Sequence, residues 1–249
     1  MFEYFISENM KIKHTFVKKL VLIAPLMIII LSVFLATNYF QVDIYNWWYT
    51  SILQGSIALG SSLLFRVDGS MKNKGVMSLP VDLKKIWIAK ILVGVKNISI
   101  SCIIIFIAGQ LSIFIIQMDS ISNISMISGL CGTLVIIITS MWQIPIYFFL
   151  SNKIGMFPTI VLSIIVSEFS VITAVNKFWW ANPFDYTDRL MCRILKLLPN
   201  GLVAKPESQT FTPELLSTWG IPFGILISIM LFIAITYLTA KWYEKQEVK

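Results

Sequence analysis

Long apolar runs separated by short polar or charged breaks dominate this sequence. The runs occupy about 20–40, 47–65, 91–117, 126–150, 157–175 and 219–240. A helix needs about 20 apolar residues to cross about 30 Å of hydrocarbon, and these runs are of that length. The pattern predicts a single all-α domain over residues 1–249 that crosses a membrane with six transmembrane helices.

The second run is more polar than the others. It contains Gln54, Gly55, Gly60, Ser61 and Ser62. Small and hydroxyl-bearing residues allow helices to approach closely in lipid, so we expect this run to pack against other helices.

Composition supports the membrane assignment. Hydrophobic residues make up 57% of the chain, charged residues only 13%, and the mean hydropathy is +0.79. Soluble domains are about 45–50% apolar and about 25% charged, so this class is excluded. The first run ends in Asn38-Tyr39-Phe40 and lacks a small-residue cleavage site, so we expect it to be retained as the first span.

The distribution of basic residues predicts the orientation. Lysines and arginines are concentrated in the N-terminal segment, in the loop after the second run and in the C-terminal tail, whereas 41–49 and 118–125 have none. The positive-inside rule therefore predicts that both termini are cytoplasmic. The segment 176–218 is the exception, because it is basic and would lie outside. Attraction of these residues to anionic lipid accounts for the net charge of +7 without a nucleic-acid partner.

Motifs of common enzymes are missing from the sequence. The stretch GSMKNKG (69–75) lacks the spacing and final hydroxyl of a phosphate-binding loop, and the chain has one histidine, His14. Neither a zinc-protease motif nor a G-x-S-x-G elbow is present. We therefore expect no catalytic residue, cofactor or metal ion in this chain.

Two regions contain candidate substrate-path residues. Glu168 lies inside the fifth run, where an ionisable residue indicates function unless it reaches the outer headgroups. The stretch DYTDRLMCRILKLLPN (185–200) has the period of an amphipathic helix, which either lies in the outer interface or tucks back between spans. The candidates are Glu168, Trp179, Trp180, Asp185, Arg189 and Arg193, with aromatic-belt anchoring and plain packing as alternatives.

Two further segments predict helices at the cytoplasmic surface. Residues 1–20 are amphipathic and lead into the first span. The stretch SLPVDLKKIWIAK (78–90) has Pro80 where a first helical turn tolerates it and Asp82 near the positive helix start, with Leu83, Ile86 and Trp87 on one face. We expect a short amphipathic helix here, immediately before the third span.

Several stretches together resemble a known family. They are SENMKIKHTFVKKL (7–20), YNWWYT (45–50), SLPVDLKKIWIAK (78–90), WQIP (142–145) and RLMCRILKLLPNG (189–201). In order and spacing the chain is similar to the lantibiotic-protection (immunity) permease subunits of type-2 ABC transporters, of the MutE/EpiE kind. One departure is Arg193, where the family pattern leads us to expect a proline after the cysteine.

The resemblance implies a permease subunit of a bacterial cell membrane that expels lantibiotic peptides. ATP and magnesium would be bound by a separate ATP-binding subunit, present in two copies, and a second related permease subunit would complete the complex. Contact with the ATPase would fall on Leu79, Pro80, Asp82, Leu83, Lys84, Lys85, Trp87 and Lys90. A permease for another amphiphile, or a membrane peptide sensor or scaffold, is the alternative.

Overall fold

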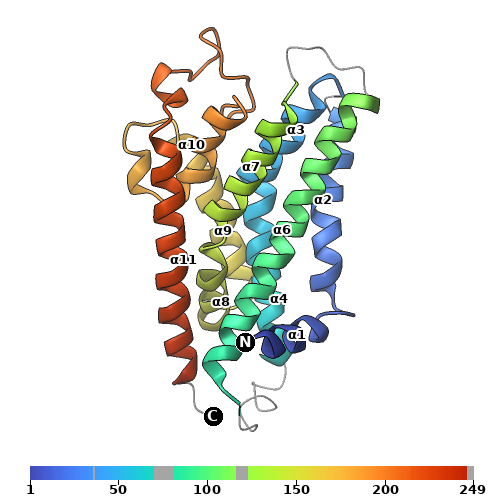
Figure 1. Ribbon diagram of the computed structural model, residues 1–249, viewed down its shortest axis with the longest axis vertical. Helices are drawn as coiled ribbons and strands as arrows, with labels where there is room; N and C mark the ends of the chain where they lie inside the picture. The colour runs from blue at the N-terminus through green and yellow to red at the C-terminus, as the bar shows by residue number, and fades with distance from the viewer. Residues whose placement is uncertain (36, 70–80, 116–122, 246–249) are drawn as a thin grey trace.

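The structure, a computed structural model, describes residues 1–35, 37–69, 81–115 and 123–245. These residues form a bundle of helices whose long axes are roughly parallel (Figure 1). The helices are α1 (Phe2–Lys11), α2 (Phe16–Leu35), α3 (Phe40–Trp47), α4 (Leu53–Gly69), α6 (Leu83–Ile115), α7 (Met126–Ser140), α8 (Gln143–Ile154), α9 (Met156–Thr173), α10 (Asp185–Ile194) and α11 (Gly220–Glu244).

Short helical pieces complete this description. A π-helical stretch, Trp48–Ile52, joins α3 to α4, and 3-10 turns form at Thr37–Tyr39, Trp179–Ala181 and Pro213–Leu216. An isolated β-bridge pairs Leu197 with Val203. The all-α prediction is therefore confirmed for the described residues.

Within the part of the chain that the structure describes, five helical stretches could cross a membrane. Length and apolar composition allow Phe16–Leu35, Leu83–Phe114, Met126–Ile154, Met156–Thr173 and Gly220–Glu244 to cross a membrane. They correspond to five of the apolar runs, with α7 and α8 forming the fourth. The chain is thus a helical membrane protein.

The second apolar run forms the π-helical stretch and most of α4. In Figure 1, α3 and α4 follow the long axis of the bundle in succession, beginning at the end opposite α1. The α4 helix packs against α8 and α9, and Gln54, Ser61 and Ser62 are buried. The expected close packing of this run against other helices is confirmed.

Local sequence explains how α8 reverses into α9. Gly155 separates the two helices with a φ of +90°, a left-handed conformation that glycine adopts without strain. The hydroxyl-bearing residues on the buried side of α9 recur at helical spacing: Thr159, Ser163, Ser167 and Ser170. These small side chains let α9 approach α4 closely.

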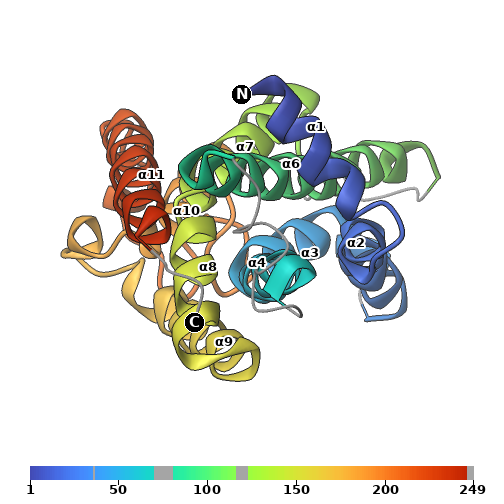
Figure 2. The same ribbon diagram turned by 90° about the horizontal axis from the view of Figure 1, so that it is seen from below.

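The α1 helix and the C-terminal end of α11 lie at the same end of the bundle (Figure 1). Viewed from that end, α1 crosses the N-terminal part of α6 and packs against it (Figure 2). The α10 helix is near the opposite end, where it packs against α7, α9 and α11. The candidate residues therefore fall into two groups at opposite ends of the molecule.

Candidate functional site

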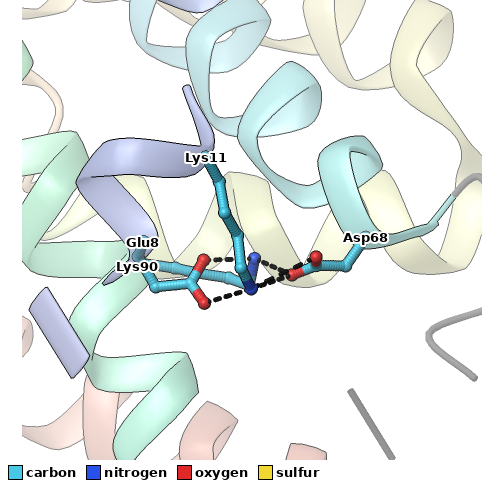
Figure 3. Close-up of polar contacts among 4 residues, drawn as sticks. All are labelled: Glu8, Lys11, Asp68 and Lys90. Atoms are coloured by element: carbon cyan, nitrogen blue, oxygen red, sulfur yellow. Dashed lines mark hydrogen bonds and ion pairs between the residues drawn. The ribbon is translucent and has the colours of Figure 1, made fainter. Parts of the chain in front are cut away.

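A group of four charged residues, of which Glu8 and Lys90 are buried and the other two partly buried, joins three helices at the end where α1 lies. This charge cluster consists of Glu8 and Lys11 from α1, Asp68 from α4 and Lys90 from α6 (Figure 3). Lys90 Nζ lies 2.8 Å from Glu8 Oε2 and 2.5 Å from Asp68 Oδ2. Lys11 Nζ lies 2.6 Å from Glu8 Oε1 and 3.2 Å from Asp68 Oδ2.

Charge balance makes this burial tolerable. Two ammonium groups face two carboxylates, so the charge cluster is neutral, and each ammonium contacts both acids. Burial opposes the charged form of Lys11, but its hydrogen bond to Glu8 and the attraction of Glu8 and Asp68 raise its pKa above the usual value. A matched set of this kind ties α1 to the bundle through charge-assisted hydrogen bonds.

Glu8 and Asp68 were not among the residues expected to matter. Glu8 is buried on the inward side of α1, where the periodicity of residues 1–20 suggested an apolar face. The sequence offered one signal, which is the spacing of Glu8 and Lys11 by three positions on a helix. Nothing in the local pattern paired them with Asp68 or Lys90.

Trp87 is the centre of an aromatic group close to the charge cluster. Its ring stacks on Tyr243 with centroids 4.6 Å apart and meets Phe148 and Trp242 edge-on at 5.5 and 5.8 Å. Its indole nitrogen donates a hydrogen bond of 3.0 Å to Thr239 Oγ1. Trp87 therefore connects α6 to α8 and α11.

The sequence predicted a short surface helix before the third span, and this prediction is wrong for residues 83–90, the helical part that the structure describes. Residues 83–90 form the first two turns of α6 itself, and Trp87 and Lys90 point into the bundle. The helix continues directly into the span because this places Trp87 and Lys90 against buried partners, which a separate surface helix could not contact. Leu79 and Pro80 lie outside the described residues.

Asp82 begins α6 as its N-terminal cap. Its Oδ1 accepts a hydrogen bond of 3.1 Å from the backbone nitrogen of Lys85, which lowers the pKa of the carboxyl. Lys85 Nζ also pairs with Asp82 Oδ2 at 3.1 Å. Asp82, Leu83 and Lys84 are half-buried and Lys85 is exposed, so this short stretch is accessible from outside.

At the opposite end, α10 is buried on both faces. Its polar residues Asp185, Asp188 and Arg189 are all buried. Of the two positions considered from the sequence, the structure shows the helix tucked among its neighbours. The helix is also shorter than expected, because it ends at Ile194 and Lys196 follows with a φ of +57°.

Polar partners from α9 account for the burial of the two aspartates. Ser170 Oγ donates to Asp188 Oδ2 at 2.7 Å, and Thr173 Oγ1 donates to Asp185 Oδ1 at 2.7 Å. Burial raises the pKa of Asp188 to about 8 and that of Asp185 to about 6, against the lowering effect of these bonds. Asp188 is therefore largely protonated at neutral pH.

Arg189 and Trp179 meet at a cavity beside α10. The guanidinium carbon lies 5.3 Å from the Trp179 ring centroid, and the guanidinium donates to the carbonyls of Ala174 and Glu214. The cavity measures about 430 Å³ and is lined by Lys177, Trp179, Arg189, Pro213, Glu214, Ser217 and Trp219. It combines aromatic walls with groups of both charges.

The other candidate residues lie apart from this cavity. Trp180 and Arg193 are exposed, while Asp185 is buried against Thr173 and Asn182. Glu168 is exposed near the α10 end of α9 and accepts a hydrogen bond of 2.9 Å from Ser51 Oγ. The structure thus brings together only Trp179 and Arg189 from the expected set.

Among the described residues, no group of three or more His, Cys, Asp and Glu side chains is arranged to hold a metal ion. Comparison with family models, with curated proteins and with solved structures found no match to this chain.

Proposed function

We propose that this chain is the six-span permease subunit of an ABC transporter that expels lantibiotic-type peptides. The sixth crossing in this proposal is made by α3, the π-helical stretch and α4. The proposal is supported by the position of α1 and of the last turns of α11 at one end of the bundle (Figure 1), since a chain that starts and finishes its helices on the same side crosses an even number of times.

The observation that carries the proposal is the position of the coupling segment, defined as residues 82–90. It begins at an accessible stretch, Asp82 to Lys85, at the end of the bundle where α1 and the last turns of α11 lie, and it continues directly into α6 (Figure 1). Farther along the segment, Trp87 contacts α8 and α11, and Lys90 contacts α1 and α4. A force applied by a partner at Asp82 to Lys85 would reach four helices through ion pairs, a hydrogen bond and aromatic contacts.

The partners follow from the resemblance and from the absence of a nucleotide-binding loop in the sequence. ATP and magnesium would bind to two copies of a separate ATP-binding subunit that contacts the coupling segment. A related permease subunit would pack against an exposed apolar face of the bundle. In this arrangement the α1 end is cytoplasmic and the α10 end faces outward, in a bacterial cell membrane.

The residues that contact the transported peptide would lie at the end of the bundle where α10 is. The cavity at Trp179 and Arg189 offers indole rings and hydrogen-bonding charges to an amphiphilic peptide. Arg193 and Trp180 would contribute from the surface, and Glu168 would interact within the outer part of the membrane.

Coexpression with candidate ATP-binding and permease subunits tests the proposal. We expect the complex to copurify and to protect cells from a lantibiotic. Substituting Asp82, Lys84 and Lys85 together by alanine should abolish protection and copurification of the ATPase while leaving membrane insertion intact. Replacement of exposed Lys205, Glu207 and Lys245 by alanine is the control, with the same change in net charge.

Particular outcomes would redirect the proposal. Full protection by the Asp82, Lys84 and Lys85 variant would remove the docking role of the coupling segment. Altered lipid distribution without any change in lantibiotic sensitivity would favour a permease for another amphiphile. Cysteine labelling at Glu3 and Lys245, which are both exposed, tests the topology, since six crossings place these two positions on the same side of the membrane and five crossings place them on opposite sides.

A further inference from the structure

A basic cavity lies where α1 turns into α2, and none of its lining residues belongs to the coupling segment or to α10. It measures about 450 Å³ and is lined by Lys13, His14, Thr15, Lys18, Lys19, Val21, Leu22 and Ile100. Three lysines and the histidine occupy one part of the lining, while Val21, Leu22 and Ile100 form an apolar wall from α2 and α6. The lining contains no carboxylate.

These cations are not neutralised within the described part of the chain. None of its ion pairs involves Lys13, Lys18 or Lys19, in contrast to Lys11, which belongs to the charge cluster. Lys96 of α6 adds to the local positive potential, since it lies near enough to Lys18 for mutual repulsion and donates only to the neutral Asn9 Oδ1. Such a site favours an anionic ligand.

The surroundings identify the kind of anion. The lysines precede the first apolar turns of a span, and Leu22 is exposed on its surface. The α1 helix leaves Phe2, Ile6 and Met10 exposed at spacings of four, as expected for a helix that dips an apolar face into the headgroup region. A ligand here would meet ammonium groups at one end and hydrocarbon at the other.

We propose that this cavity binds the phosphate headgroup of an anionic phospholipid, with the start of an acyl chain against Val21, Leu22 and Ile100. Basic pockets between spanning helices bind anionic headgroups in this manner. The site goes beyond general attraction of basic residues to the membrane surface, because a defined cavity holds one lipid. It does not depend on the transport function proposed above.

Lipid titration of the full-length protein tests the site. The purified chain, in a neutral detergent, is titrated with phosphatidylglycerol and with phosphatidylcholine, and bound lipids are counted by native mass spectrometry. We expect one phosphatidylglycerol to bind in preference to phosphatidylcholine. Each lysine near an anionic headgroup contributes about fivefold in affinity, so K13Q/K18Q/K19Q should lose roughly a hundredfold.

Matched variants separate a specific site from a diffuse charge effect. The triple variant R66Q/K241Q/K245Q removes the same charge from exposed positions at the same end of the bundle and should bind the lipid as the unmodified protein does. K13R/K18R/K19R should retain binding, and the single variants each report a partial loss if the triple variant does not fold.

Three outcomes would overturn the proposal. They are unchanged affinity in K13Q/K18Q/K19Q, an equal loss of affinity in R66Q/K241Q/K245Q, and binding of inorganic phosphate alone with an affinity that matches that of the lipid. The last result would show a free-anion site in which the apolar wall takes no part.

Discussion

Lys90 of α6 and Glu8 of α1, which are 82 positions apart in the chain, form a buried ion pair with Nζ 2.8 Å from Oε2. Lys90 also binds Asp68, so one ammonium group holds three helices together (Figure 3). This arrangement makes α1 an integral part of the bundle.

Replacing Lys90 with methionine should destabilise the protein strongly. The change leaves Glu8 and Asp68 with only Lys11 as a partner, and breaking a buried ion pair costs about 3–5 kcal/mol in the free energy of unfolding. The measurement is denaturant unfolding in detergent, with Lys241→Met as an exposed control. In the double variant K90M/E8Q, the opposite charges of Lys11 and Asp68 still balance, so this variant should recover much of the lost stability. A double variant no more stable than K90M would contradict the charge-balance explanation.

Thr239→Val should destabilise the Trp87 contact by about 1–3 kcal/mol, because the buried indole N–H loses its acceptor. Thr239→Ser retains a hydroxyl and should be close to the unmodified protein. Thr236 on the same helix has a buried hydroxyl with no hydrogen-bond partner, so Thr236→Val serves as the control. Thermal unfolding monitored by tryptophan fluorescence distinguishes the three variants. Equal effects of the two valine substitutions would count against the bond.

Asp188 predicts a pH dependence of stability. Its pKa is about 8 in the folded protein against about 3.9 in an unfolded chain, so between these values the folded state holds a proton that the unfolded state releases. Stability should therefore fall as pH rises from about 4 to about 8. Asp185, with a pKa of about 6, adds a fall of the same sign between about 4 and 6. In Asp188→Asn, the midpoint temperature of unfolding should depend less on pH between pH 6 and 8. An unchanged dependence on pH in this range would refute the contribution of Asp188.

Gly132→Ala should loosen the packing of α10 against α7. A Cβ at this position would lie 2.8 Å from Leu195 Cδ2 and 3.1 Å from Leu195 Cγ, so the buried leucine must move. Overpacking of this kind costs about 1–3 kcal/mol. Gly55→Ala is the control, because its Cβ would have 3.9 Å of room and alanine favours the helix. If both variants unfold at the same denaturant concentration, the close contact between Gly132 and Leu195 does not determine the stability of this packing.

Much of the fold was predictable from the sequence because hydrocarbon imposes a simple rule on it. Spanning helices must be long and apolar, and five of the predicted runs meet that rule in the structure. The run with Gln54, Ser61 and Ser62 was also predicted to pack closely, since small residues in a membrane helix have that consequence.

The candidate site was harder to predict, because a helical period shows which residues share a face but not what that face meets. Asp185, Asp188 and Arg189 have the pattern of a solvent-facing stripe, yet all three are buried. Their burial is possible because Thr173 and Ser170 donate hydrogen bonds to the two aspartates, and because two backbone carbonyls accept hydrogen bonds from Arg189. Trp87 and Lys90 were predicted to contact a partner protein, but inside this chain they contact other helices.

The sequence by itself determined the helical membrane class, the apolar runs and the amphipathic segments, because these follow from local composition and period. Only the tertiary structure decided that Glu8, Lys11, Asp68 and Lys90 neutralise one another, and that α10 is buried. The reason is physical: the energy of a buried charge depends on partners within a few ångströms, and those partners come from helices far apart in the chain.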